Sequence, residues 1–153
     1  VFRKIIRKEY DEIVGRKETA QYFRSLVLYK YAYRGWAVTS RCKRTLKASR
    51  QFDDVINSGS GYKRVRIVNS GIGTFALLYA LVNKNADVTA YESDVDSYSV
   101  AVATPCLPKN LHYIHAVWDS EYDCADKYDL SIILGAQCVD KSHEGTIFLP
   151  LKS

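Results

Sequence analysis

The residues best suited to chemistry in this 153-residue chain lie in one short turn, NSGIGT, from Asn69 to Thr74. The turn joins a β-branched run, RVRIV, to an apolar run, TFALLYALVN, that is typical of a helix. Small residues in such a turn let the backbone approach a ligand closely, and the helix N-terminus offers unpaired N–H groups. The turn therefore predicts a binding site for a nucleotide-like ligand.

A carboxylate follows at a suitable distance along the chain. Glu92, in VTAYESD, stands 19 positions after Gly73, at the end of the next predicted strand. A carboxylate at that place can accept hydrogen bonds from both hydroxyls of a ribose. A strand, a Gly-x-Gly turn, a helix, a second strand and a terminal acid, in this order, indicate a site for a nucleoside-containing cofactor.

The elements that must position these residues occupy the chain after residue 61. The residue patterns predict strands at 64–68, 87–91, 111–117, 129–134 and 145–151, and helices at 74–83 and 95–104. Strands that alternate with helices form right-handed βαβ crossovers and a parallel sheet. We therefore expect an α/β fold, a three-layer Rossmann-like parallel sheet truncated to about five strands and preceded by N-terminal helices.

The N-terminal part of the chain is basic and helical. Apolar spacing predicts helices at 2–14, 18–33 and 36–56. Residues 1 to 50 hold 14 Lys and Arg against 4 Asp and Glu, whereas the rest of the chain holds 8 against 13. We therefore divide the chain into a basic helical segment, 1–60, and a Rossmann-like domain, 61–153.

Three groups of side chains are expected to be structural. A stripe along the second helix should pack against the sheet or other helices: Tyr22, Leu26, Tyr29 and Tyr33. The cysteines form no C-x-x-C pair and are expected to be reduced and mostly buried: Cys42, Cys106, Cys124 and Cys138. His112 and His115 stand three apart in a predicted strand, which sends them to opposite faces, so no metal site is expected.

At this point a family resemblance becomes visible. The segments VRIVNSGIGTFALLYAL, ADVTAYESD, NLHYIHAVW and KYDLSIILG resemble the first four strands of a class I S-adenosylmethionine (SAM)-dependent methyltransferase, over roughly residues 62–149. The resemblance implies SAM as the cofactor. It also implies the residues that would bind it: Asn69, Ser70, Gly71, Gly73, Glu92, Asp119 and Gly135.

The chain departs from the family pattern at three positions. Ile67 stands where the first motif usually has an acid, and Asn69 stands at the first of its three glycines. Val117 replaces the acid that meets the adenine, although Asp119 follows two residues later. We therefore interpret the chain as a degenerate SAM-dependent methyltransferase-like domain, a non-catalytic or regulatory module.

A second resemblance concerns the lead-in YKYAYRGWAVTSRCKRTLK. It is similar to the segment that precedes methyltransferase domains in large Bacteroidetes-type proteins, where the domain is joined to a glycerolipid acyltransferase or a lipid exporter. The resemblance implies a larger lipid-metabolising polypeptide as partner, an anionic membrane surface beside the basic half, and a cytoplasmic location at the inner face of a membrane. The chain begins at Val1 and contains no Met, so we expect a domain cut from a longer protein.

Three alternatives stay open. In the first alternative, the domain is an active methyltransferase, and Gly135, Ala136 and Gln137 line the methyl donor. Its general base is then one of three residues: Asp94, Asp119 or His143. A basic nucleic-acid-binding module is the second, although no recognised RNA-binding motif accompanies its cations: Arg41, Lys43, Arg44, Lys47 and Arg50. An NAD-type site is the third, through Gly71, Gly73 and Ala76.

Overall fold

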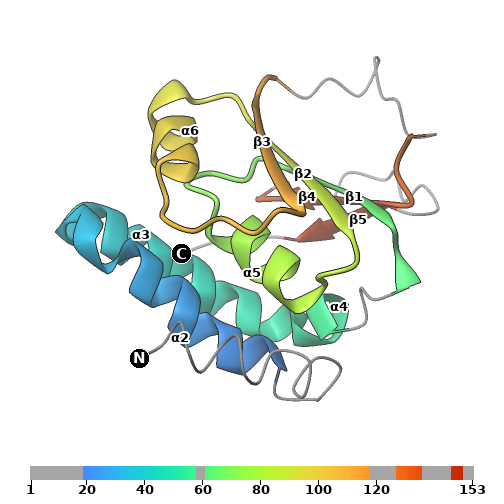
Figure 1. The fold of residues 1–153 in the computed structure, drawn as a ribbon, viewed down its shortest axis with the longest axis horizontal. Coiled ribbons are helices and arrows are strands. Elements are labelled where there is room, and N and C mark those ends of the chain that lie inside the picture. Colours follow the sequence, from blue (N-terminus) through green and yellow to red (C-terminus); the bar gives the residue numbers. More distant parts are fainter. Residues whose placement is uncertain (1–18, 58–60, 118–126, 136–145, 150–153) are drawn as a thin grey trace.

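The computed structural model of the protein describes residues 19–57, 61–117, 127–135 and 146–149. Its centre is a five-stranded parallel sheet. The strands are β1 Arg64–Val68, β2 Asp87–Glu92, β3 Leu111–His115, β4 Leu130–Leu134 and β5 Thr146–Leu149, in the order β3-β2-β1-β4-β5 (Figure 1). The predicted α/β class and the truncated parallel sheet are confirmed.

The order in which the chain adds strands to the sheet reverses beside β1. The chain passes from β1 to β2 and β3 on one side and then returns to β4 and β5 on the other. In the register, Val68 of β1 stands opposite Tyr91 of β2 and opposite Ile133 of β4. Open α/β sheets bind ligands beyond the carboxyl ends of their strands at such a reversal. The turn that follows Val68 therefore lies where a binding site is expected.

The described N-terminal helices are α2 Thr19–Tyr31 and α3 Trp36–Ala48, joined by the 3-10 turn η1 Ala32–Arg34. The buried stripe of α2 is offset from the predicted one, because it consists of Ala20, Phe23, Val27 and Tyr31, each fully buried. Within the predicted stripe, Leu26 is buried and Tyr22 packs against the core, but Tyr29 is 43% exposed. The side chain of Tyr33 lies outside the described residues.

The single helix predicted over 36–56 is wrong. Residues Ser49–Phe52 form a 3-10 turn, η2, and Asp53–Asn57 form a short helix, α4. The buried hydroxyl of Ser49 donates to the carbonyl oxygen of Leu46 at 2.9 Å. A serine that bonds locally in this way competes with the helical ladder, which explains the break. The helix predicted at 2–14 lies outside the described residues.

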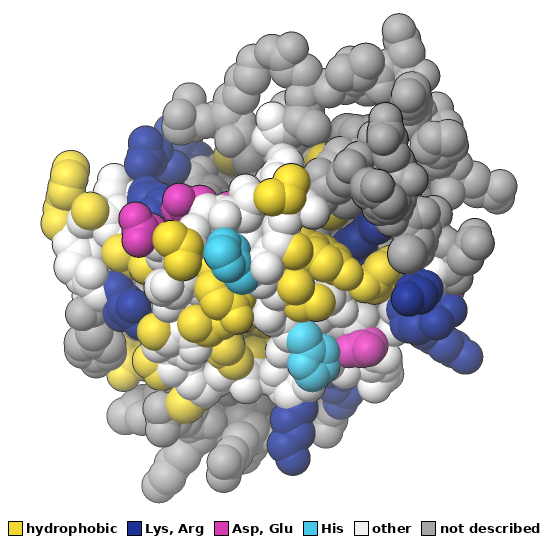
Figure 2. Space-filling view, turned by 90° about the horizontal axis from the view of Figure 1, so that it is seen from above, with side chains coloured by type: hydrophobic (Ala, Val, Ile, Leu, Met, Phe, Trp, Pro, Cys, Tyr) yellow, Lys and Arg dark blue, Asp and Glu magenta, His cyan; other side chains and the backbone are white. Residues whose placement is uncertain are grey.

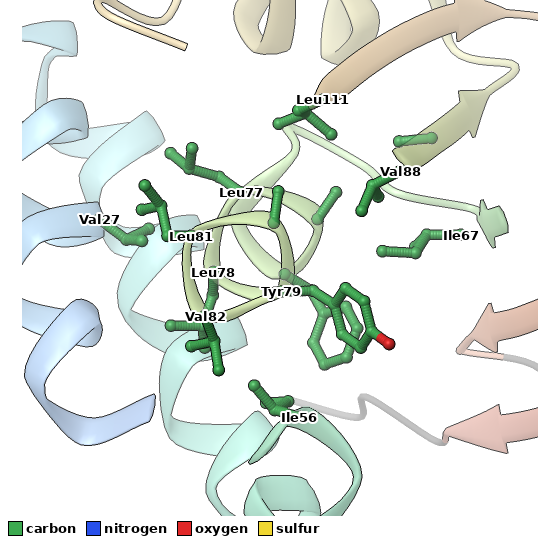
Figure 3. Packing of buried hydrophobic residues seen from close by; sticks show 14 of the residues in the cluster. Val27, Ile56, Ile67, Leu77, Leu78, Tyr79, Leu81, Val82, Val88 and Leu111 are labelled. Carbon is green, nitrogen blue, oxygen red and sulfur yellow. The ribbon is translucent and has the colours of Figure 1, made fainter. Parts of the chain in front are cut away.

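Helix α5, Thr74–Val82, is the centre of the core, and all nine of its residues are buried. A helix that is apolar on every side must be covered on every side. Figure 3 shows its side chains directed outward in several directions, towards the sheet on one side and the N-terminal helices on the other. Its labelled neighbours there come from five elements: Val27 of α2, Ile56 of α4, Ile67 of β1, Val88 of β2 and Leu111 of β3.

Helix α6, Val95–Val102, connects β2 to β3. Two successive right-handed crossovers in one direction place α5 and α6 on the same face of the sheet. In the described ranges, no helix is long and apolar enough to cross a bilayer.

Candidate functional site

The turn after β1 keeps the left-handed backbone that its glycines predict. Gly71 has φ +59° and Gly73 has φ +89°. Asn69, which replaces the first glycine of the family pattern, also adopts a left-handed conformation, with φ +60°. Asparagine is among the side chains that tolerate this region best. Asn69 therefore adopts here the left-handed backbone conformation that a glycine would adopt.

Hydrogen bonds fasten this turn to the strands on both sides. The N–H of Ser70 donates to the carbonyl oxygen of Tyr91 on β2 at 3.0 Å. The side-chain amide of Asn69 donates to the carbonyl oxygen of Leu134 on β4 at 3.3 Å. The turn thus connects β2 and β4, the two strands on either side of β1, through its own polar groups.

The carboxylate of Glu92 is part of the same structure. Its Oε1 accepts the N–H of Gly71 at 2.8 Å, and its Oε2 accepts the N–H of Asp94 at 2.8 Å. A carboxylate offers about four acceptor positions, so two are left for a ligand. Glu92 can therefore hold the turn and still accept hydrogen bonds from a ribose.

Asp94 has a structural partner. Its carboxylate caps α6 by accepting the N–H of Ser97 at 3.0 Å. This hydrogen bond lowers the pKa of Asp94, and the positive charge of Arg41 adds to the effect. The candidate general base is thus ionised and engaged at a helix N-terminus.

Two tyrosines that sequence reasoning missed hold the other side of the turn. The phenol of Tyr31, from α2, donates to the carbonyl oxygen of Ile72 at 2.6 Å. The phenol of Tyr113, from β3, donates to the carbonyl oxygen of Gly73 at 3.1 Å. Burial raises the pKa of both phenols well above the ordinary value, so both stay protonated and able to donate. One signal in the sequence pointed to Tyr113: it stands two residues after Leu111 in the strand, so both side chains lie on the same face of the sheet.

A cavity of about 370 Å³ opens beside the turn. Its wall consists of the turn, the start of α5, the end of β4 and one face of α3: Asn69, Ser70, Gly71, Ile72, Thr74, Leu134, Gly135, Arg41 and Thr45. The structure therefore brings together Asn69, Ser70, Gly71 and Gly135 from the predicted set. Gly73 and Glu92 lie next to this wall in the same turn and hydrogen-bond network, and Asp119 lies outside the described residues.

The polar groups of the cavity suit an anion. Helix α5 begins after Gly73 without a side-chain cap, so its first N–H groups are available. The hydroxyl of Ser70 is buried and has no hydrogen-bond partner in the described part of the chain. Arg41 adds a positive charge, and its guanidinium also donates to the Ser97 hydroxyl at 2.9 Å. A carboxylate placed here would meet a cation and a helix N-terminus, beside the Ser70 hydroxyl.

Ile67, the replacement for the first-motif acid, is fully buried and packs in the core with α5. It does not line the cavity. Ile67 therefore leaves the volume of this cavity open. Val117 is 78% exposed.

The remaining candidates lie apart from the cavity. His115 stacks on Tyr98, whereas His112 lies 3.3 Å from a carboxylate oxygen of Asp87, as expected of opposite strand faces. On the face shown in Figure 2, one histidine side chain borders an acidic one, and another lies close to apolar side chains. Among the described residues, no group of three or more His, Cys, Asp or Glu is placed to hold a metal. Cys42 is buried, but Cys106 is exposed, and the other two cysteines lie outside the described residues.

No family model and no curated protein match this chain. Solved structures do. Coclaurine N-methyltransferase, bound to N-methylheliamine and SAH, gives a TM-score of 0.47 at 19% identity over 59% of this chain. StiE O-MT gives a TM-score of 0.45 at 18% identity over 56% of this chain. The plantazolicin methyltransferase BpumL, in complex with SAH, gives a TM-score of 0.43 at 16% identity over 85% of this chain.

The chain covers 26%, 32% and 50% of those three proteins, so it spans half of their length or less. Likenesses at this level of identity concern the fold alone.

Proposed function

We propose that this chain is a SAM-binding domain of the methyltransferase type, and that the cavity beside the Asn69–Thr74 turn holds the amino acid end of the cofactor. One observation carries the proposal. The turn residue Ser70, whose hydroxyl has no partner among the described residues, the uncapped start of α5 and Arg41 all line one cavity. SAM carries a carboxylate, which needs such donors.

Each part of the site has a separate task in this proposal. Arg41 and the N-terminus of α5 bind the carboxylate. Glu92 accepts the ribose hydroxyls through its remaining acceptor positions. Asn69 and Gly71 keep the backbone close to the ligand, and the phenols of Tyr31 and Tyr113 hold that backbone in place. SAM would supply a methyl group bound to a positively charged sulfonium, and loss of the methyl group leaves a neutral thioether. The protein therefore mainly aligns the acceptor.

Isothermal titration of the chain with SAM and with S-adenosylhomocysteine tests the proposal. We expect binding in the micromolar range or tighter, and a loss of roughly tenfold in the variant Arg41→Gln, because a charge-assisted contact is removed. Arg44→Gln is the matched control, since Arg44 lies on the same helix but not on the cavity. Absence of binding to both ligands would overturn the proposal.

The degenerate, non-catalytic module is the second candidate. It is favoured by the burial of Ile67 in place of an acid and by the structural engagement of Glu92 and Asp94. A domain that binds SAM but transfers no methyl group to a panel of small-molecule and lipid acceptors would serve as a regulatory module. Radiolabelled methyl transfer to such a panel distinguishes the two candidates.

The lead-in YKYAYRGWAVTSRCKRTLK supports a further proposal about context. In this proposal the domain belongs to a larger lipid-metabolising polypeptide, joined to an acyltransferase or exporter, at the inner face of a membrane. Immunoblotting of cell fractions with an antibody against this domain tests it. A product of larger mass in the membrane fraction is expected, and a soluble product of the mass of this chain would contradict it.

A further inference from the structure

A second hollow lies on the other side of α3, away from the cavity described above. It has a volume of about 300 Å³ and runs between α2 and α3, so we name it the α2–α3 groove. Lys43 and Lys47 of α3 and Arg50 of η2 line it, at spacings of four and three residues. Lys43 and Lys47 lie one turn apart on the same side of α3, and Arg50 follows them in η2, whereas Arg41 and Thr45 face the first cavity.

The charge of the α2–α3 groove is of one sign. Arg24 of α2 is its fourth basic residue, and no acidic residue is among the described residues that line it. Lys43, Lys47 and Arg50 are exposed, and none of their side chains has a hydrogen-bond or ion-pair partner in the described ranges. Like charges one helical turn apart repel each other, so an anion between them would remove a strain that the protein alone retains.

Arg24 provides a second, independent observation. It is only 6% exposed, and its guanidinium pairs through one terminal nitrogen with Asp53 and donates to the Ser49 hydroxyl at 3.5 Å. Its Nε is buried and has no hydrogen-bond partner among the described residues. A buried N–H without an acceptor is costly. An oxygen atom at the base of the groove would satisfy it.

The remaining lining indicates the kind of anion. Leu28 and Leu46 add apolar surface, and Ser25 adds a hydroxyl. A ligand that combines a multiply charged, oxygen-rich group with a short carbon skeleton matches this combination. We propose that the α2–α3 groove is a second binding site of this protein and that it takes a phosphate monoester, either a free metabolite or the headgroup of a lipid. Lys43, Lys47 and Arg50 bind the phosphate above the Nε of Arg24.

Titration of the chain with inorganic phosphate and with glycerol phosphate tests the site. We expect saturable binding of both, tighter for the ester. The double variant Lys43→Gln/Lys47→Gln should weaken it by about tenfold or more, because two charge-assisted contacts are lost. Lys63→Gln/Lys109→Gln, which removes the same charge from exposed lysines elsewhere, should bind like the unchanged chain. Thermal melting must show that both variants fold.

Two further arms identify the source of the phosphate. Co-sedimentation with vesicles of phosphatidylcholine and phosphatidic acid, against phosphatidylcholine alone, reveals binding of a lipid headgroup, whereas binding of glycerol phosphate without sedimentation indicates a free metabolite. Arg44→Gln should leave both signals unchanged, since Arg44 lies on α3 but lines neither the groove nor the first cavity. The proposal is overturned by absence of phosphate binding, by equal binding in the two lysine double variants, or by a single-stranded oligonucleotide that binds more tightly than the ester.

Discussion

The backbone N–H of Gly71 donates a 2.8 Å hydrogen bond to Oε1 of Glu92. The turn that would approach the ligand and the acid that would bind its ribose are thus one connected structure. The other oxygen of Glu92 accepts the N–H of Asp94, which caps α6. One side chain therefore links the end of β1, the end of β2 and the start of α6.

Replacing Glu92 should affect both binding and stability. Glu92→Gln keeps the shape but turns one of the two acceptor oxygens into an NH2 group, so that one of the hydrogen bonds from the Gly71 and Asp94 N–H groups is lost. We expect a loss of about 1–2 kcal/mol in the free energy of unfolding and weaker SAM binding. Urea denaturation and isothermal titration measure the two effects. Asp96→Asn, an exposed acid in the first turn of α6, is the control. If Glu92→Gln and the control have the same free energy of unfolding, the hydrogen bonds of Glu92 do not contribute to stability as we expect.

A side chain at Gly73 should be costly for two reasons. Its φ of +89° disfavours any other residue, and an added Cβ would lie 2.4 Å from the phenol oxygen of Tyr113. Gly35 has a similar φ, +92°, but nothing within 4 Å, so Gly35→Ala isolates the backbone cost of about 1 kcal/mol. We expect Gly73→Ala to lower the melting temperature clearly more than Gly35→Ala. Equal effects would show that Tyr113 moves aside freely.

The stability of the protein should fall at alkaline pH. Burial raises the pKa of Tyr31, Tyr79 and Tyr113 in the folded state. The unfolded chain loses these protons near pH 10, so the folded state is fully favoured below that pH and loses stability above it, by about 1.4 kcal/mol per pH unit for each buried phenol.

Tyr31→Phe should make this decline shallower. The same variant should lose stability at pH 7, because the 2.6 Å hydrogen bond to Ile72 disappears. Denaturant unfolding of both proteins between pH 7 and pH 11 measures the slopes. Identical slopes would mean that Tyr31 ionises without unfolding.

The described cysteines should differ in reactivity. Burial raises the pKa of the Cys42 thiol to about 11, whereas Cys106 is exposed. Since the thiolate is the reactive form, brief alkylation of the folded chain at pH 8 should modify Cys106 and spare Cys42. Peptide mapping by mass spectrometry identifies the sites, with alkylation in urea as the control. Modification of Cys42 in the folded chain would contradict its burial.

The elements themselves follow from local pattern. The β-branched runs of β1 and β4, the wholly apolar α5 and the two glycines of the turn are each visible within a few residues. Their alternation then restricts the sheet to parallel crossovers. Local pattern predicted two features wrongly. It missed the end of α3, where the Ser49 side chain bonds to the backbone. It also placed the buried stripe of α2 along its aromatic residues, whereas the buried residues are offset from them.

The sequence by itself thus determined the parallel sheet, the turn from Asn69 to Thr74 and the position of Glu92, because these depend on spacing along the chain. Only the tertiary structure decided which distant groups meet there. Tyr31 and Tyr113 reach carbonyls 41 and 40 residues away, and Arg41 enters the cavity from a different helix. Such meetings depend on how helices pack over the sheet, and residue spacing carries no record of that packing.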